Sequence, residues 1–140
     1  MERTEESVDE FLRAHDIDGS LSLLDSALRE ELPDASRALW RGVFWGGTEQ
    51  AIIGYGDIVQ PRPRGKDVEW FLIGLARQKD YVSLYVNAAE GGQYLAKVYG
   101  KDMGASKVGS ASISFRAADG LDFTVLRVMV RHAARIQAYR

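Results

Sequence analysis

The first 34 residues place apolar side chains at the three- and four-residue spacing that is typical of α-helices. Residues 4–15 predict a first helix, capped by Thr4 or Ser7. Its apolar face carries Val8, Phe11, Leu12 and His15. From residue 20 to residue 32 leucines recur at the same spacing, and Pro33 ends the segment. The chain is therefore expected to begin with two amphipathic helices.

Beyond residue 35 the apolar pattern changes to that of strands, with glycine and proline at the turns between them. Strands are predicted over residues 38–45, 51–59, 69–77, 81–87 and 110–115. The third of these is almost wholly apolar, so we expect it to be central and covered on both faces. The last two alternate strictly, and their polar positions should share one face: Tyr81, Ser83, Tyr85, Asn87, Ser110, Ser112 and Ser114.

Two further helices complete the predicted order α-α-β-β-β-β-α-β-α. They cover residues 93–99 and 121–138. The second should turn an apolar face inward, made of Val125, Val128, Met129, Ala133 and Ile136. Strands joined by short turns, with helices grouped at the ends, indicate an α+β fold. We expect one domain over residues 1–140, with an antiparallel sheet of about five strands and helices packed on one face.

Composition removes several kinds of chemistry. The chain has no cysteine, so disulfides, thiolate metal sites and cysteine nucleophiles are excluded. His15 and His132 are the two histidines, and neither belongs to a recognisable nucleophile–base motif. A net charge of −2 argues against a nucleic-acid partner. We therefore expect no cofactor and no catalytic residues, and a binding module rather than an enzyme.

The small net charge conceals a strong asymmetry along the chain. Residues 1–34 hold eleven acidic and three basic residues, whereas residues 35–140 hold nine acidic and fifteen basic ones. Such halves either attract each other within one fold or present separate surfaces to partners. The acidic first residues do not resemble a signal peptide, and the longest apolar run, 70–76, is too short to cross a bilayer. A cytoplasmic protein without a membrane partner is expected.

Six segments resemble the YdhG-like family of small bacterial domains of unknown function. They read VDEFL (8–12), LPDA (32–35), GYG (54–56), FLIGLARQK (71–79), VSLY (82–85) and KVGSASISF (107–115). Their order and spacing carry the resemblance, which spans nearly the whole chain. It implies an α+β fold of the kind predicted above. One branch of the family is described as frataxin-like iron chaperones, which implies iron binding as an alternative function.

The sheet face opposite the helices is the predicted site. If the helices cover one side only, Trp70 or Leu72 should be exposed on the other, and an exposed apolar patch usually marks a ligand groove or a protein interface. The candidate ligand-binding residues are Tyr55, Trp70, Lys79, Tyr85 and Lys107, with Trp40, Trp45, Arg62 and Arg64 as further aromatic and basic neighbours. This set predicts either a pocket for a small anionic ligand or a homodimer interface.

Two charged stripes offer alternatives. On the first helix Glu5, Glu6 and Asp9 supply carboxylate oxygens that suit a ferrous ion, although such a run is usually a solvated face. On the last helix Arg127, Arg131 and Arg135 recur every four residues. That stripe would meet either nucleic-acid phosphates or the acidic first helix, or remain solvated.

Overall fold

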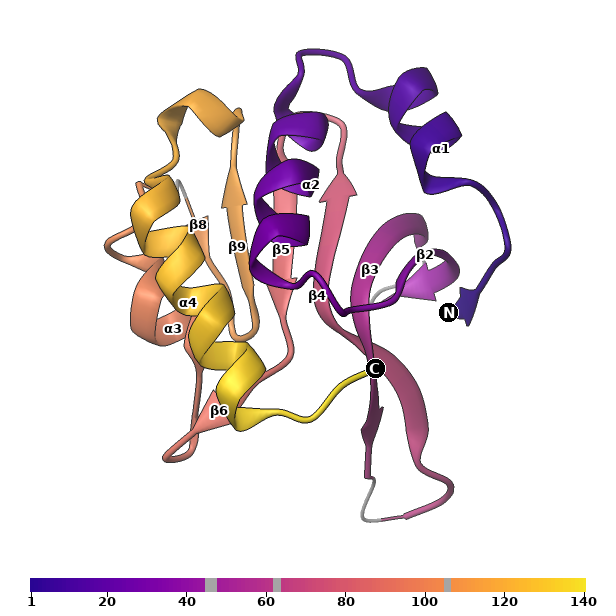
Figure 1. Cartoon of the computed structure of the whole chain (residues 1–140), viewed down its shortest axis with the longest axis vertical. Coiled ribbons are helices and arrows are strands. Elements are labelled where there is room, and N and C mark those ends of the chain that lie inside the picture. Colours follow the sequence, from indigo (N-terminus) through magenta and orange to yellow (C-terminus); the bar gives the residue numbers. More distant parts are fainter. Residues whose placement is uncertain (45–47, 62–63, 105–106) are drawn as a thin grey trace.

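The fold rests on a seven-stranded antiparallel sheet, seen in a computed structural model that describes residues 1–44, 48–61, 64–104 and 107–140 (Figure 1). Its strands are β1 (Glu2–Arg3), β2 (Arg37–Phe44), β3 (Thr48–Gln60), β4 (Val68–Arg77), β5 (Val82–Val86), β8 (Lys107–Val108) and β9 (Ser112–Phe115). They lie in the order β1-β2-β3-β4-β5-β9-β8. A separate hairpin pairs β6 (Ala89–Glu90) with β7 (Gln93–Tyr94).

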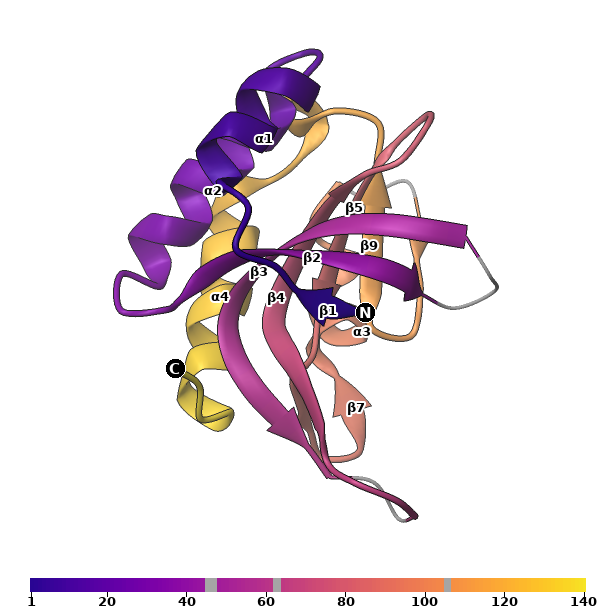
Figure 2. The same ribbon diagram turned by 90° about the vertical axis from the view of Figure 1, so that its right-hand side faces the viewer.

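Helices cover one face of this sheet, as predicted. They are α1 (Val8–His15), α2 (Ser20–Glu31), α3 (Leu95–Gly100) and α4 (Phe123–Ile136), with a 3₁₀ turn, η1, at Ala118–Gly120. Figure 2 shows α1, α2 and α4 on the same side of the strands. The α+β class is confirmed, but β1, β6, β7 and β8 were not predicted, because a two-residue strand carries no periodic pattern.

The main core lies between the helices and the sheet. Leu24 and Leu28 of α2 meet Leu75 and Leu84 of the central strands, and all four are buried. From α4 the buried stripe is Leu126, Met129, Val130 and Ala133, which follows the spacing of one helical face. The prediction that Val128 points inward was wrong: this side chain is 43% exposed, because it lies outside that stripe.

Ion pairs connect the acidic front of the chain to its basic remainder. The Arg37 guanidinium lies 2.7 Å from an Asp9 oxygen and 2.9 Å from Asp25. Arg41 Nε lies 2.6 Å from a Glu6 oxygen. These arginines belong to β2, whereas Asp9 lies in α1, Asp25 in α2 and Glu6 in the segment before α1, so the two halves attract each other within one fold.

The arginine stripe of α4 is paired with the second helix. Arg131 donates to both carboxylate oxygens of Glu31, at 2.6 and 3.0 Å. Arg127 lies 2.8 Å from Glu30 and 3.1 Å from Glu31. The partner of the stripe is therefore α2 and not the first helix.

A second, smaller apolar layer covers part of the opposite sheet face. It holds Trp40, Phe71 and Ala76, with Trp70 packed against it. The Trp70 ring stacks on Phe71 with centroids 4.6 Å apart, and Trp40 meets both rings edge-on at 5.9 and 5.6 Å. Of the two residues named as candidates for exposure here, Trp70 is partly exposed, whereas Leu72 is fully buried in the helix-side core.

Two paired glycines allow the aromatic layer to lie on the sheet backbone. Gly54 of β3 is the cross-strand partner of Gly74 of β4. A Cβ at Gly54 would lie 2.6 Å from Trp40 Nε1, and one at Gly74 would collide with the Phe71 ring. The aromatic side chains therefore occupy the space that two side chains would otherwise fill.

Replacing Gly74 by alanine should destabilise the protein by about 1–3 kcal/mol, the usual cost of forcing extra volume into a packed site. This cost exceeds the small stabilisation that alanine gives by reducing the conformational entropy of the unfolded chain. Chemical denaturation measures the difference. Gly120→Ala is the matched control, because nothing lies within 4 Å of its added Cβ, and it should change stability by less than about 0.5 kcal/mol. Equal losses in both variants would contradict the close packing.

The Glu31 ion pairs predict a pH-dependent contribution to stability. Hydrogen bonds, that from Arg131 foremost, hold the pKa of the Glu31 carboxyl below its usual value of 4.5. A lowered folded-state pKa stabilises the fold above the unfolded-state pKa and ceases to do so as the pH falls through the folded-state value. Glu31→Gln should therefore lower the denaturation midpoint at pH 7 and leave it unchanged near pH 2. A difference that persists at pH 2 would contradict the assignment.

Candidate functional site

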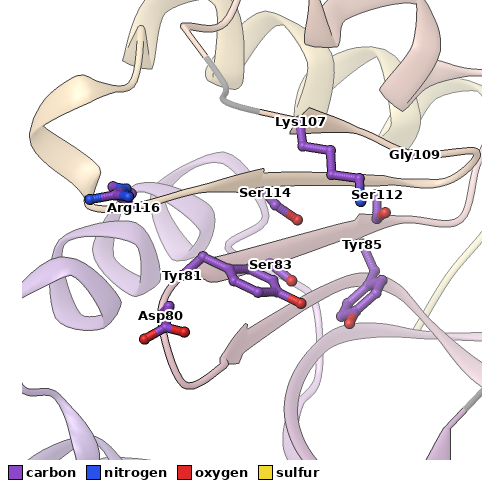
Figure 3. Close-up of a pocket in the computed structure, with 9 residues that line it drawn as sticks. All are labelled: Asp80, Tyr81, Ser83, Tyr85, Lys107, Gly109, Ser112, Ser114 and Arg116. Carbon is purple, nitrogen blue, oxygen red and sulfur yellow. The ribbon is translucent and has the colours of Figure 1, made fainter.

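The open sheet face contains a recess, here called the polar hollow, of about 430 Å³. It extends over β5, β9 and β8 and is drawn in Figure 3. Its lining is dominated by hydroxyl groups and charged side chains: Asp80, Tyr81, Ser83, Tyr85, Lys107, Gly109, Ser112, Ser114 and Arg116.

Strand register explains why a hollow forms here. Ser83 of β5 faces Ser114 of β9, which in turn faces Lys107 of β8. Two residues further along β5, Tyr85 is the cross-strand partner of Ser112. These positions share the open face, where the short serine side chains leave a recess between the longer Tyr85 and Lys107 side chains.

Lys107 reaches this face because its neighbour packs on the other. Val108 lies against Gly100 of α3, where an added Cβ would come within 2.7 Å of a valine methyl. With Val108 on the helix side, alternation places Lys107 on the open side. In Figure 3 the lysine side chain runs along the hollow and its amino group lies by Ser112, whereas Arg116 and Asp80 lie at the opposite end.

Tyr85 presents a neutral hydroxyl to the hollow. Burial raises its pKa above 10, and hydrogen bonds with the Ser83 and Gln78 side chains offset only part of that rise. Gln78 is itself fixed, since its Nε2 donates to Gln50 Oε1 at 2.9 Å. The phenol therefore stays protonated at neutral pH in a hydrogen-bonded setting.

A larger recess of about 720 Å³, here called the apolar hollow, adjoins the first. Its lining combines aromatic and aliphatic side chains with a polar margin: Met1, Val43, Val68, Trp70, Tyr85, Asn87, Tyr94, Ser110, Ala111 and Ser112. Tyr85 and Ser112 belong to both hollows, so the two are continuous along the sheet face.

The polar face predicted from alternation lies where it was expected, since all seven of its residues line one hollow or the other. Of the five candidate ligand-binding residues, the structure brings together Trp70, Tyr85 and Lys107. Lys79 is exposed in the turn between β4 and β5 and lines neither hollow.

Of the further aromatic and basic neighbours, the two that the structure describes, Trp40 and Arg64, do not join the hollows. Trp40 is buried within the aromatic layer. Arg64 is exposed in the loop after β3 and lines neither hollow. Trp45 and Arg62 lie outside the described residues.

Tyr55 belongs to the opposite side of the sheet, which corrects its assignment to the site. Its side chain is 1% exposed, and its hydroxyl donates to Asp25 Oδ1 at 2.6 Å. Burial raises the pKa of Tyr55 well above 10, and the nearby Asp25 charge adds to the rise. Arg37 donates to the same carboxylate at 2.9 Å, so Tyr55 completes a buried network that ties α2 to the sheet.

The first-helix carboxylates are engaged by arginines. Hydrogen bonds from Arg41 and Arg37 lower the pKa values of Glu6 and Asp9, respectively, while Glu5 is exposed. In the part of the chain that the structure describes, no group of three or more histidine and acidic side chains is arranged to hold a metal ion. The structure does not bring Glu5, Glu6 and Asp9 together as an iron site.

Sequence reasoning missed the partners of His132. Its Nδ1 lies 2.7 Å from the Tyr99 hydroxyl and its Nε2 lies 3.0 Å from a Glu90 oxygen. Glu90 is 42 residues away, so no local spacing announces the contact. The chain of hydrogen bonds attaches the β6–β7 hairpin to α3 and α4, and this hairpin carries Tyr94 into the apolar hollow.

Several lining residues were also missed. Arg116 continues the alternation of the polar positions 110, 112 and 114, so the signal for it was present in the sequence. Met1, Val43 and Tyr94 gave none, because their placement depends on pairings between distant segments.

No family model, curated protein or solved structure matches the chain, so the resemblance to the YdhG-like family stays an expectation. Within the described ranges, no helix has the length and apolar character needed to cross a membrane.

Tyr55→Phe should lower the free energy of unfolding by about 1–3 kcal/mol, because it leaves the buried Asp25 carboxylate without one donor. Tyr85→Phe is the matched comparison: its side chain lies at a half-exposed position, where water replaces the lost hydrogen bond, and the loss should stay below about 1 kcal/mol. Urea denaturation of both variants measures the two effects. A larger loss for Tyr85→Phe would contradict the placement of the two phenols.

Proposed function

We propose that this protein is a binding module that holds a small anionic ligand in the polar hollow of its open sheet face. The observation that carries the proposal is the convergence of Lys107 with several hydroxyl groups in one recess. Hydroxyl groups donate hydrogen bonds to anionic oxygens, and an ammonium group supplies the opposite charge. A volume of about 430 Å³ is in the range of small-molecule sites.

The charges around the hollow favour an anion of low charge. Lys107 and Arg116 contribute two positive charges, and Asp80 contributes one negative charge at the far end. Lys107 takes part in none of the ion pairs found among the described residues, unlike Arg37, Arg41, Arg127 and Arg131. Arg116 takes part in none of them either, but it lies at the end of the hollow where Asp80 lies, so Lys107 is the cation beside Ser112 (Figure 3).

Acid–base chemistry finds less support than binding does. His132 is held by Tyr99 and Glu90, and His15 packs on the Phe11 ring in α1, with centroids 4.5 Å apart. Neither histidine lines the hollows. The proposal is therefore one of recognition, without a reaction.

A homodimer is the second candidate, because apolar side chains beside the hollows are exposed. Val43 is 60% exposed and Tyr94 is 40% exposed, and both lie at the apolar hollow. Aromatic side chains are enriched at protein interfaces. A second copy of the chain would cover the same face that a ligand would occupy.

Titration of ¹⁵N-labelled protein with acetate should shift the amide signals of β5, β8 and β9. Lys107→Met should weaken this binding up to about fivefold, the usual effect of an exposed charge pair. Lys79→Met removes the same charge outside the hollow and should leave the affinity unchanged. Equal effects of the two variants would contradict the proposal. Sedimentation as a dimer, with no acetate-induced shifts, would favour the second candidate.

A further inference from the structure

The Lys107 ammonium lies close to the boundary between the polar and apolar hollows. Tyr85 and Ser112 line both recesses, and the Lys107 amino group lies beside Ser112 in Figure 3. Arg116, the other cation of the polar hollow, lies at the far end near Asp80. A ligand held by Lys107 therefore has an apolar surface within reach on one side and hydroxyl groups on the other.

Aromatic rings dominate the apolar side of this junction. Trp70, Tyr85 and Tyr94 line the apolar hollow from three different strands. Trp70 is held by stacking on Phe71, at a centroid distance of 4.6 Å and an interplanar angle of 21°. Tyr94 lies on the hairpin that the Glu90–His132 contact attaches to α4. The stacked Trp70 ring loses little freedom when a ligand packs on it.

We propose that the ligand is an aromatic carboxylate, whose carboxylate binds Lys107 and Ser112 while its ring lies in the apolar hollow against Trp70 and Tyr94. This inference rests on the proposed function and adds a chemical class to it. One positive charge at the junction matches one carboxylate. A flat ring is favoured over an alkyl chain because aromatic pairs gain energy beyond that of burial, and because a chain must be ordered on binding.

The position of the carboxylate also determines how much space is left for the ring of the ligand. The carboxylate lies at the junction, so the ring has the apolar hollow of about 720 Å³ to itself. This is ample for one or two fused rings. Hydroxyl substituents next to the carboxylate would face the serines of the polar hollow.

The test compares four probes by NMR titration: 2-naphthoate, 2-naphthamide, octanoate and acetate. We expect 2-naphthoate to bind about tenfold or more tightly than acetate, because its ring is buried. It should bind about threefold to tenfold more tightly than the uncharged 2-naphthamide and than octanoate. Amide shifts should appear in β7 with 2-naphthoate and be absent from β7 with acetate.

Two variants test separately how the ring and the carboxylate of the ligand contribute to binding. Tyr94→Ala should weaken 2-naphthoate about threefold to tenfold and leave acetate unchanged, whereas Lys107→Met should weaken both. Val128→Ala is the matched control, an exposed apolar truncation on α4 outside both hollows. Dispersed amide spectra verify that each variant is folded.

The two proposals fail in different ways. Equal affinities for 2-naphthoate and acetate, or no effect of Tyr94→Ala, would overturn the aromatic class and leave anion binding intact. Octanoate binding as tightly as 2-naphthoate would replace the ring by an aliphatic chain. Equal affinities for 2-naphthoate and 2-naphthamide, with no effect of Lys107→Met on either, would overturn anion binding itself.

Discussion

A seven-stranded sheet has two faces, and the helices of this chain cover one of them. The other face is closed in part by the contact of Trp40 and Phe71 with the bare backbone of Gly54 and Gly74. Without these glycines the rings would stand away from the strands, and the apolar centre of the sheet would meet water. The same contact sets the limit of the open region: on the β5 side of Gly74 the face carries serines and Tyr85 in place of large apolar groups. The polar hollow is the part of the face that the aromatic layer leaves uncovered, and Trp70, which packs against that layer, lines the apolar hollow.

The charged residues also differ between the helix side and the open face of the sheet. The acidic front and the basic remainder neutralise each other mainly on the helix side, through Arg37, Arg41, Arg127 and Arg131. This pairing matters for the fold at the buried Asp25, whose carboxylate accepts hydrogen bonds from both Arg37 and Tyr55. With these arginines engaged, the charge presented on the open face is decided by a few residues at the hollows. The net charge of −2 therefore says little about what the site attracts.

The periodicity of the sequence predicted those features that depend on local strand geometry alone. The alternation of residues 81–87 and 110–115 located the polar face of both hollows, since a strand shows the same side chains to the same side wherever it pairs. It did not predict which side Tyr55 takes, because that depends on the Asp25 partner supplied by α2. The Glu90–His132 contact was beyond sequence reasoning for the same reason, because it joins distant segments. The β6–β7 hairpin is a local pairing and was missed because its two-residue strands carry no periodic pattern.

The shape of the open face favours a ligand over a protein partner as its occupant. An interface between two copies is well served by a flat apolar surface. Here small side chains, namely Ala76, Ser83 and Ser114, lie in one cross-strand row, so the face is recessed where it is most polar. A second copy would have to remove water from the exposed Lys107 ammonium and then pair it again, or lose the free energy of leaving it unpaired. A small molecule that enters the recess with its own acceptor oxygens meets that requirement directly, and its apolar part then covers Trp70.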